Sequence, residues 1–204
     1  MKGSIYTLGY AGILGVVCSL LLTAVASVTA PMRTANAEAE ETLNILTALQ
    51  VPMPENASKK RLAEIREKNV REEERQEFIA YAYVGGAEGK VEAVAVRFAG
   101  WGLWGPMKGF LAVEADMRTI RGLTFYEQEE TPGLGGKIDE PKFKKQFVGK
   151  KIVDETGRPG IIIKGGKAEN AQNEVDAITG ATMTCDKVRE ILTSVAAKIV
   201  KEYD

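Results

Sequence analysis

The sequence predicts an α+β protein: an N-terminal transmembrane helix followed by a mostly antiparallel sheet with flanking helices. Three observations support this class. No charged side chain occurs from Gly3 to Met32. From Phe78 onward, apolar residues alternate in stretches that are interrupted by turn signals, as in β-hairpins. The last 19 residues carry apolar side chains at helical spacing on one face.

The apolar segment from Tyr10 to Ala30 is long enough to cross a membrane. At about 1.5 Å per residue, a helix over these residues spans roughly 30 Å, the thickness of the hydrocarbon core. We expect Pro31 and Arg33 to mark its end. The predicted organisation is a short N-terminal segment (1–9), a transmembrane helix (10–31), a helical connector (32–75) and a globular domain (76–204).

A cleaved secretory signal peptide is the alternative for this segment. Lys2 could serve as its positive n-region, and residues 35–37 (Ala-Asn-Ala) fit an A-x-A cleavage site. The apolar run exceeds the usual h-region of ~7–15 residues, which favours an uncleaved anchor. Both interpretations place the remainder on the outer, periplasmic face of the cell's inner membrane.

Composition excludes several kinds of chemistry. The 204 residues include 27 basic and 28 acidic side chains, no histidine and two cysteines, with a net charge of −1. Without histidine there is no Ser-His-Asp triad and no histidine-ligated zinc or haem. Two cysteines cannot hold an all-cysteine metal cluster, so no metal site is expected. The near-neutral charge argues against nucleic acid as a partner.

The remaining helices and strands are predicted from the spacing of apolar residues and from the prolines and glycines that interrupt it. Residues 37–49 are expected to continue the first helix until Pro52 and Pro54 break it, and the charge-rich residues 56–76 are expected to form an exposed helix. Two hairpins are predicted, then strands, then a closing helix. Their expected ranges are 78–84 with 90–100, 109–115 with 119–127, strands at 149–154 and 160–166, and the helix at 186–203.

Three segments contain more glycine and polar residues than a sheet needs. They are 100–106 (GWGLWGP), 130–136 (ETPGLGG) and 176–184 (DAITGATMT). The third lies directly before the closing helix, whose free N–H groups and partial positive charge suit a phosphate. The simpler interpretation of the third segment is that Thr182 or Thr184 caps the helix. A plain glycine-rich loop is the simpler interpretation of the second.

The segment Asp176 to Thr182 (DAITGAT) resembles the flavinylation motif D-x-x-[ST]-G-A-T of the FMN-binding domain family. Residues 130–135 (ETPGLG) resemble a second motif of that family. The arrangement, from the membrane helix through most of 98–200, is similar to the family of C subunits of Na⁺-translocating NADH:quinone reductases and to the related G subunits of Rnf complexes. The likeness to the sodium-pump family is favoured because 109–115 and 123–127 resemble it more closely.

The resemblance implies covalent FMN, attached through its phosphate to the hydroxyl of Thr182. Asp176 would then belong to the sequence that a flavin transferase reads, with Thr179, Gly180 and Ala181 completing the motif. The second motif would seat the flavin, with Glu130 and Thr131 nearest to it and Gly133, Leu134 and Gly135 allowing close backbone approach.

Trp101 and Trp104 are candidates to stack on the flavin, and core packing at a glycine-rich bend is the alternative. Two residues depart from the family pattern: Trp101, where relatives often have tyrosine, and Gln128, where they often have histidine.

The function implied is that of an electron-transfer component in a membrane-bound, sodium-translocating NADH:quinone oxidoreductase, with the other subunits as partners. No G-x-G-x-x-G segment at a strand–helix junction occurs, so we do not expect this chain to oxidise NADH alone, and no residue is expected to be catalytic in its own right. Three alternatives are an Rnf-type component, a stand-alone exported FMN carrier, and a membrane-tethered binding module without flavin.

Overall fold

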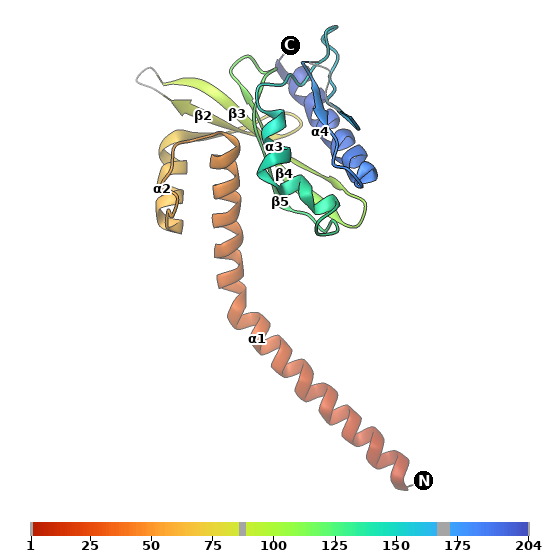
Figure 1. The fold of residues 1–204 in the computed structure, drawn as a ribbon. Helices are drawn as coiled ribbons and strands as arrows, with labels where there is room; N and C mark the ends of the chain where they lie inside the picture. Colours follow the sequence, from red (N-terminus) through yellow and green to blue (C-terminus); the bar gives the residue numbers. More distant parts are fainter. Residues whose placement is uncertain (1, 86–88, 167–171, 204) are drawn as a thin grey trace. The chain divides into compact units, whose positions relative to one another are not determined.

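The computed structural model describes residues 2–85, 89–166 and 172–203. The chain divides into two compact units, residues 1–39 and residues 40–204. The expected turn at Gly86 lies outside the described residues. Figure 1 traces the chain from the N-terminus (red) to the C-terminus (blue).

The first helix, α1 (Lys2–Ala48), passes through Pro31 without ending there. Pro31 and Arg33 end the apolar run, and the helix continues beyond them, in line with the expectation that residues 37–49 extend it. Proline removes one helical hydrogen bond, whereas the Ala- and Glu-rich residues that follow are strong helix formers and continue the helix. From Tyr6 to Met32 the large apolar side chains are exposed, and the helix is long and apolar enough to cross a membrane. This suggests a single-pass anchor.

The last turns of α1 belong to the second unit and end before Pro52, as expected. Ile45, Leu46 and Leu49 are fully buried there, whereas Leu43 is partly exposed. The next helix, α2 (Lys59–Asn69), is shorter than predicted because β1 (Val70–Glu74) follows it directly. The charged residues of β1 form an edge strand, where charge opposes pairing with other chains.

The sheet has five strands in the order β1-β2-β3-β4-β5, with every neighbouring pair antiparallel. This confirms the predicted class and both hairpins. The remaining strands are β2 (Ile79–Gly85), β3 (Lys90–Trp101), β4 (Pro106–Glu114) and β5 (Ile120–Glu127).

Alternating residues of the sheet build two separate cores. Val94, Val96 and Phe98 face the C-terminal helix α4 (Thr182–Tyr203). Ala93 and Ala95 on the same strand pack with the end of α1 and with α2. Figure 1 shows the sheet between α4 (blue) and the helices on its other face. Successive residues of β3 point to opposite faces of the sheet, and on both faces they are buried in a core.

Between β5 and α4 the chain forms short elements. They are η1 (Gly135–Asp139), α3 (Pro141–Lys144), η2 (Lys145–Phe147), β6 (Ile162–Lys164) and β7 (Glu174–Asp176), with β6 and β7 parallel. The predicted strand at 149–154 is wrong. Those residues make only isolated bridges, Thr119 with Lys151 and Val153 with Pro159. Gly149 has a φ of +79°, which interrupts extended backbone.

The closing helix is confirmed, but α4 begins at Thr182, four residues before the predicted start at 186. Val188, Leu192, Val195 and Ile199 are buried and Ile191 is half-buried, as their spacing predicts. Because α4 is packed on the sheet along its length, its N-terminus is held in a fixed place beside the ends of β3 and β5.

Candidate functional site

A cavity of about 320 Å³ lies at the N-terminus of α4. This is within the range of roughly 300–1,000 Å³ that is typical of small-molecule sites. All three glycine-rich segments contribute to it. Its lining residues are Leu103, Trp104, Glu130, Thr131, Leu134, Gly135, Gly180, Ala181, Thr182, Met183 and Thr184.

Glu130 joins the three segments that form this cavity. Its Oε1 accepts hydrogen bonds from the backbone N–H groups of Leu103 (2.7 Å) and Trp104 (3.2 Å). Its Oε2 accepts a 2.7 Å hydrogen bond from the hydroxyl of Thr184. The side chains of Glu130 and Thr184 are both buried. Since a carboxylate with several donors is well suited to burial, Glu130 fixes the 103–104 turn and the start of α4 to its own loop.

Gln128 fixes the loop that carries Glu130. Its Oε1 accepts a 2.8 Å hydrogen bond from the backbone N–H of Glu130. Gln128, which departs from the expected family pattern, therefore has a structural contact in this chain. That contact restricts the direction from which the Glu130 side chain enters the cavity.

Two glycines allow this close packing. A Cβ at Gly135 would lie 2.6 Å from Thr184 Oγ1 and 2.7 Å from Glu130 Oε2, and a Cβ at Gly102 would lie 2.4 Å from Glu130 Oε1. Glu130 and Thr184 are thus the neighbours that require glycine at 135, and the expected close approach of this loop to a flavin stays a prediction. Gly133 and Gly180 have φ of +76° and +80°, the left-handed region that favours glycine.

Thr182 is the first residue of α4, and its side chain is exposed. The first helical hydrogen bond runs from the N–H of Cys185 to the carbonyl of Ala181, 3.0 Å away, so Ala181 occupies the N-cap position. The interpretation of Thr182 or Thr184 as the cap is therefore wrong. Thr182 belongs to the first turn of α4, whose N–H groups have no carbonyl partner within the helix.

The two tryptophans differ in their relation to the cavity. Trp104 lines the cavity, whereas Trp101 is not among its lining residues. Their exposed fractions of 69% and 74% contradict core packing at the glycine-rich bend. Trp101 is the last residue of β3, opposite Pro106 of β4.

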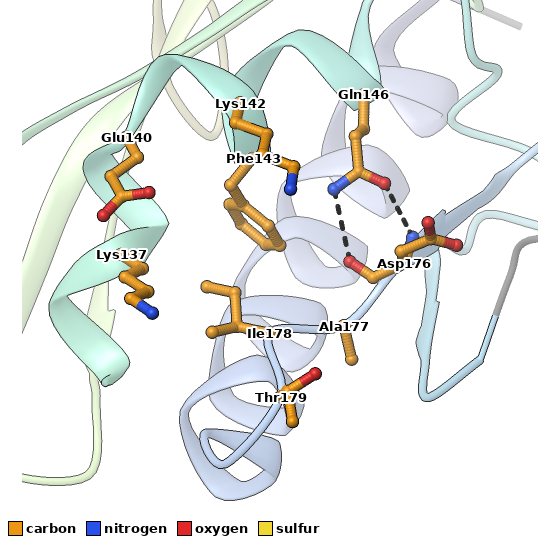
Figure 2. A pocket seen from close by; sticks show the side chains of 9 residues that line it. All are labelled: Lys137, Glu140, Lys142, Phe143, Gln146, Asp176, Ala177, Ile178 and Thr179. Carbon is orange, nitrogen blue, oxygen red and sulfur yellow. Dashed lines mark hydrogen bonds between the residues drawn. The ribbon is translucent and has the colours of Figure 1, made fainter. Parts of the chain in front are cut away.

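A second cavity, of about 450 Å³, is lined in part by residues 176–179 of the segment that precedes α4. Figure 2 shows the side chains that line it. Asp176 and Thr179 line this cavity and not the first one. Gln146 from η2 binds the backbone of Asp176 twice. It accepts from the N–H at 2.9 Å and donates to the carbonyl at 3.3 Å. The expected motif is thus divided: residues 176–179 face one cavity and residues 180–182 the other.

Cys185 holds the segment between the two cavities against α4. The backbone N–H of Ile178 donates to the Cys185 sulfur at 3.3 Å, and burial raises the pKa of this thiol. The contact gives Cys185 a packing role. In the part of the chain that the structure describes, no group of three potential metal ligands lies together.

Sequence reasoning missed Leu103, Met183 and Thr184 as cavity residues. Leu103 and Met183 add apolar wall and are each next to a residue that was singled out. Thr184 was considered as a cap and as a second hydroxyl for attachment, but not as a partner of Glu130. Residues two apart in a helix lie on nearly opposite sides, and Thr182 is exposed whereas Thr184 is buried. No local pattern therefore indicated the contact of Thr184 with Glu130.

Residues 102–197 match the FMN-binding domain family. The Na⁺-translocating NADH-quinone reductase C subunit of Vibrio campbellii is 47% identical over 100 residues, which are 48% of this chain and 38% of that protein. The corresponding protein of Vibrio alginolyticus is 39% identical over 124 residues, 60% of this chain and 48% of that protein. The matched part thus spans less than half the length of these relatives.

Two solved structures share the fold. The crystal structure of the Na⁺-translocating NADH-quinone reductase C subunit from Parabacteroides distasonis aligns with a TM-score of 0.71 and 25% identity, covering 85% of this chain and 97% of that one. The structure of NqrC from Shewanella oneidensis aligns with a TM-score of 0.68 and 23% identity, covering 81% and 97%.

Proposed function

We propose that the protein is a membrane-anchored electron-transfer component of a Na⁺-translocating NADH-quinone reductase. The support is that residues 102–197 match the FMN-binding domain family and that the C-terminal half of the chain is homologous to the C subunit of this reductase. In this proposal FMN is attached covalently to Thr182 through a phosphoester. The other subunits of the complex supply and accept the electrons.

The observation that carries the proposal is the position of the Thr182 hydroxyl. It is exposed, it lines the 320 Å³ cavity, and it is on the first residue of a 22-residue helix. The N–H groups and the dipole of a helix N-terminus stabilise a phosphate. Thr184, the other hydroxyl on this turn, is buried and donates to Glu130, so it is not accessible for attachment.

The residues around the cavity fit the rest of the cofactor. Leu103, Trp104, Leu134 and Met183 offer apolar surface for a flat ring system, and Thr131 and Gly135 complete this wall of the cavity. Flavin supplies one-electron chemistry when bound. The chain's own contribution is to hold the phosphate end at α4 and to fix the cavity wall through Glu130.

Membrane anchoring by α1 keeps the domain near its membrane partners, and we propose that the domain lies on the outer, periplasmic side. A flavin transferase attaches the FMN, with Asp176 and Thr179 as part of the sequence that it reads. A covalent bond is useful on that side of the membrane, because lost FMN could not readily be replaced there.

In-gel flavin fluorescence under denaturing conditions tests the attachment. The chain is produced with a flavin transferase, and only covalent flavin stays on the denatured band. We expect Thr182→Ala to be dark and Thr182→Ser to stay fluorescent. Thr184→Ser is the control, because it keeps the hydroxyl that bonds to Glu130 and should stay fluorescent. A fluorescent Thr182→Ala band would contradict the proposed attachment.

Co-purification tests which complex, if any, contains the chain. Recovery of the tagged chain with the other subunits of a sodium-translocating reductase supports the proposal. Recovery with Rnf-type subunits, or as a free flavoprotein, would contradict the assignment to this complex while leaving the flavin site intact.

A further inference from the structure

Glu130 is the only charged side chain among the described residues that line the 320 Å³ cavity. The other lining residues are apolar, as are Leu103, Trp104, Leu134 and Met183, or small, or they carry a hydroxyl. Only 4% of Glu130 is exposed. Because a buried charge is screened much less than a charge in water, this carboxylate acts on any group that fills the cavity.

The Glu130 carboxylate is not neutralised by a cation. Its hydrogen-bond donors are the backbone N–H groups of Leu103 and Trp104 and the hydroxyl of Thr184, all of which are uncharged. None of the ion pairs in the described parts of the chain includes Glu130. Hydrogen bonds from donors to both oxygens suit the charged form of a carboxyl group. The cavity wall therefore contains one negative charge without a counter-charge from lysine or arginine.

The packing around Glu130 keeps this charge in the cavity wall. Gln128 accepts a 2.8 Å hydrogen bond from the Glu130 N–H. The two carboxylate oxygens occupy the space that side chains would need at Gly102 and Gly135, since a Cβ there would lie 2.4 and 2.7 Å from them. The carboxylate cannot turn out to solvent without losing its three hydrogen bonds.

A negative charge in the wall opposes the arrival of an electron in the cavity. Reduction of a bound group by one electron adds one negative charge there, unless a proton from solvent accompanies the electron. The N-terminus of α4 contributes a partial positive charge, but the phosphate proposed at Thr182 brings negative charge to the same place. Coulomb repulsion from Glu130 thus favours the oxidised form of a redox group in this cavity.

We propose that the charge of Glu130 lowers the reduction potential of the flavin held in this cavity. This inference rests on the proposed function, in which FMN is attached at Thr182 and another subunit supplies the electron. Glu130 then has two separable roles: its hydrogen bonds hold the cavity wall, and its charge lowers the potential. A lower potential makes the reduced cofactor a stronger electron donor to the next subunit.

Spectroelectrochemical titration of the flavinylated full chain in detergent, with dithionite as the reductant, measures this potential. Glu130→Gln keeps the shape of the side chain and removes its charge. We expect this variant to be reduced more easily than the parent chain. The equilibrium constant for one-electron reduction should rise by on the order of tenfold, which is about 59 mV. An unchanged or lower potential in Glu130→Gln would overturn the proposal.

Two further carboxylate variants separate the charge of Glu130 from its structural role. Glu130→Asp keeps the charge and weakens the hydrogen bonds, and its potential should stay close to that of the parent chain. Glu129→Gln removes a neighbouring, exposed carboxylate that does not line the cavity, and solvent screens that charge, so its potential should also be unchanged. If Glu130→Asp raised the potential as much as Glu130→Gln, lost contacts would explain the shift and the role of the charge would be refuted.

A cation added to the wall gives a test that leaves every hydrogen bond of Glu130 in place. Met183 lines the cavity and is 63% exposed, so a lysine is tolerated there. Met183→Lys supplies the positive charge that the described lining residues lack, and it should raise the potential. A potential equal to that of the parent chain would contradict the electrostatic argument.

Flavin fluorescence of the same samples on a denaturing gel separates this inference from the proposed function. Fluorescent chains with equal potentials in the parent and in Glu130→Gln would remove the role of Glu130 and leave the flavin attachment standing. A dark parent chain, produced with the transferase, would remove the proposed function and this inference with it.

Discussion

Replacement of Glu130 by alanine should be the most damaging single substitution in the candidate site. The carboxylate accepts hydrogen bonds from Leu103, Trp104 and Thr184, and only 4% of the residue is exposed. A hydrogen bond to a charged group contributes about 1.5–3 kcal/mol. The two amides are on exposed residues and can bind water after the change, whereas the Thr184 hydroxyl stays buried without its acceptor. We therefore expect a loss of about 2–4 kcal/mol in the free energy of unfolding.

Two matched variants sharpen this prediction. Glu130→Gln keeps the shape and can still accept from the amides while donating to Thr184, so it should cost about 1 kcal/mol. Glu129→Ala removes an adjacent, exposed carboxylate and should change stability by no more than about 0.5 kcal/mol.

Urea unfolding of the full chain in detergent, followed by tryptophan fluorescence, measures these differences. Both tryptophans of the chain lie in or beside the turn that Glu130 holds, so the signal reports on the relevant segment. Hydrogen exchange at residues 103 and 104 should also accelerate in Glu130→Ala. If Glu130→Ala unfolds at the same urea concentration as Glu129→Ala, the structural role given to Glu130 is wrong.

Three further substitutions test other contacts. Gly135→Ala places a Cβ against Thr184 and Glu130 and should cost about 1–3 kcal/mol, whereas Gly165→Ala, with open space around it, should be nearly neutral in urea unfolding. Gln146→Ala removes both hydrogen bonds to the Asp176 backbone and should cost about 1–2 kcal/mol, with faster hydrogen exchange at 175–178; unchanged exchange would refute the contact. Burial opposes ionisation of Asp116, but hydrogen bonds from Thr119, the Arg118 backbone and Lys151 outweigh it and hold the pKa of this carboxyl well below its usual range. A carboxyl with a lowered folded-state pKa stabilises the fold above its unfolded pKa of about 3.9 and loses that contribution as pH falls. Asp116→Asn should thus be less stable than the parent chain at pH 7, by no more than about 1 kcal/mol at this half-exposed site, and the gap in unfolding midpoint should narrow toward pH 3; a gap that is constant with pH would contradict this.

The spacing of apolar residues predicted those elements in which one spacing, that of a strand or that of a helix, continues from end to end. The two hairpins and the closing helix follow patterns of two and 3.6 residues, and they are present. The predicted helix over 56–76 failed at Val70, because its charged residues fit an exposed helix and an edge strand equally well. Pairing with β2, which no local pattern encodes, decides between these structures.

The sequence identified the three segments that form the candidate site, but not the hydrogen bonds between them. Glycine and motif content selected the three segments that meet at the cavity. The roles within them depend on contacts across long sequence separations. Glu130 reaches Thr184, 54 residues away, and Gln146 reaches Asp176, 30 residues away. The prediction that Glu130 lies near a flavin is untested, and sequence reasoning did not anticipate that its carboxylate bonds to Leu103, Trp104 and Thr184.

The most direct test of the account is peptide mass spectrometry of the full chain purified from a host that attaches flavins. The account predicts an FMN increment on the peptide that contains Thr182, located to that hydroxyl by fragmentation, and unmodified peptides elsewhere. An unmodified Thr182 peptide, or the increment on another residue, would contradict it.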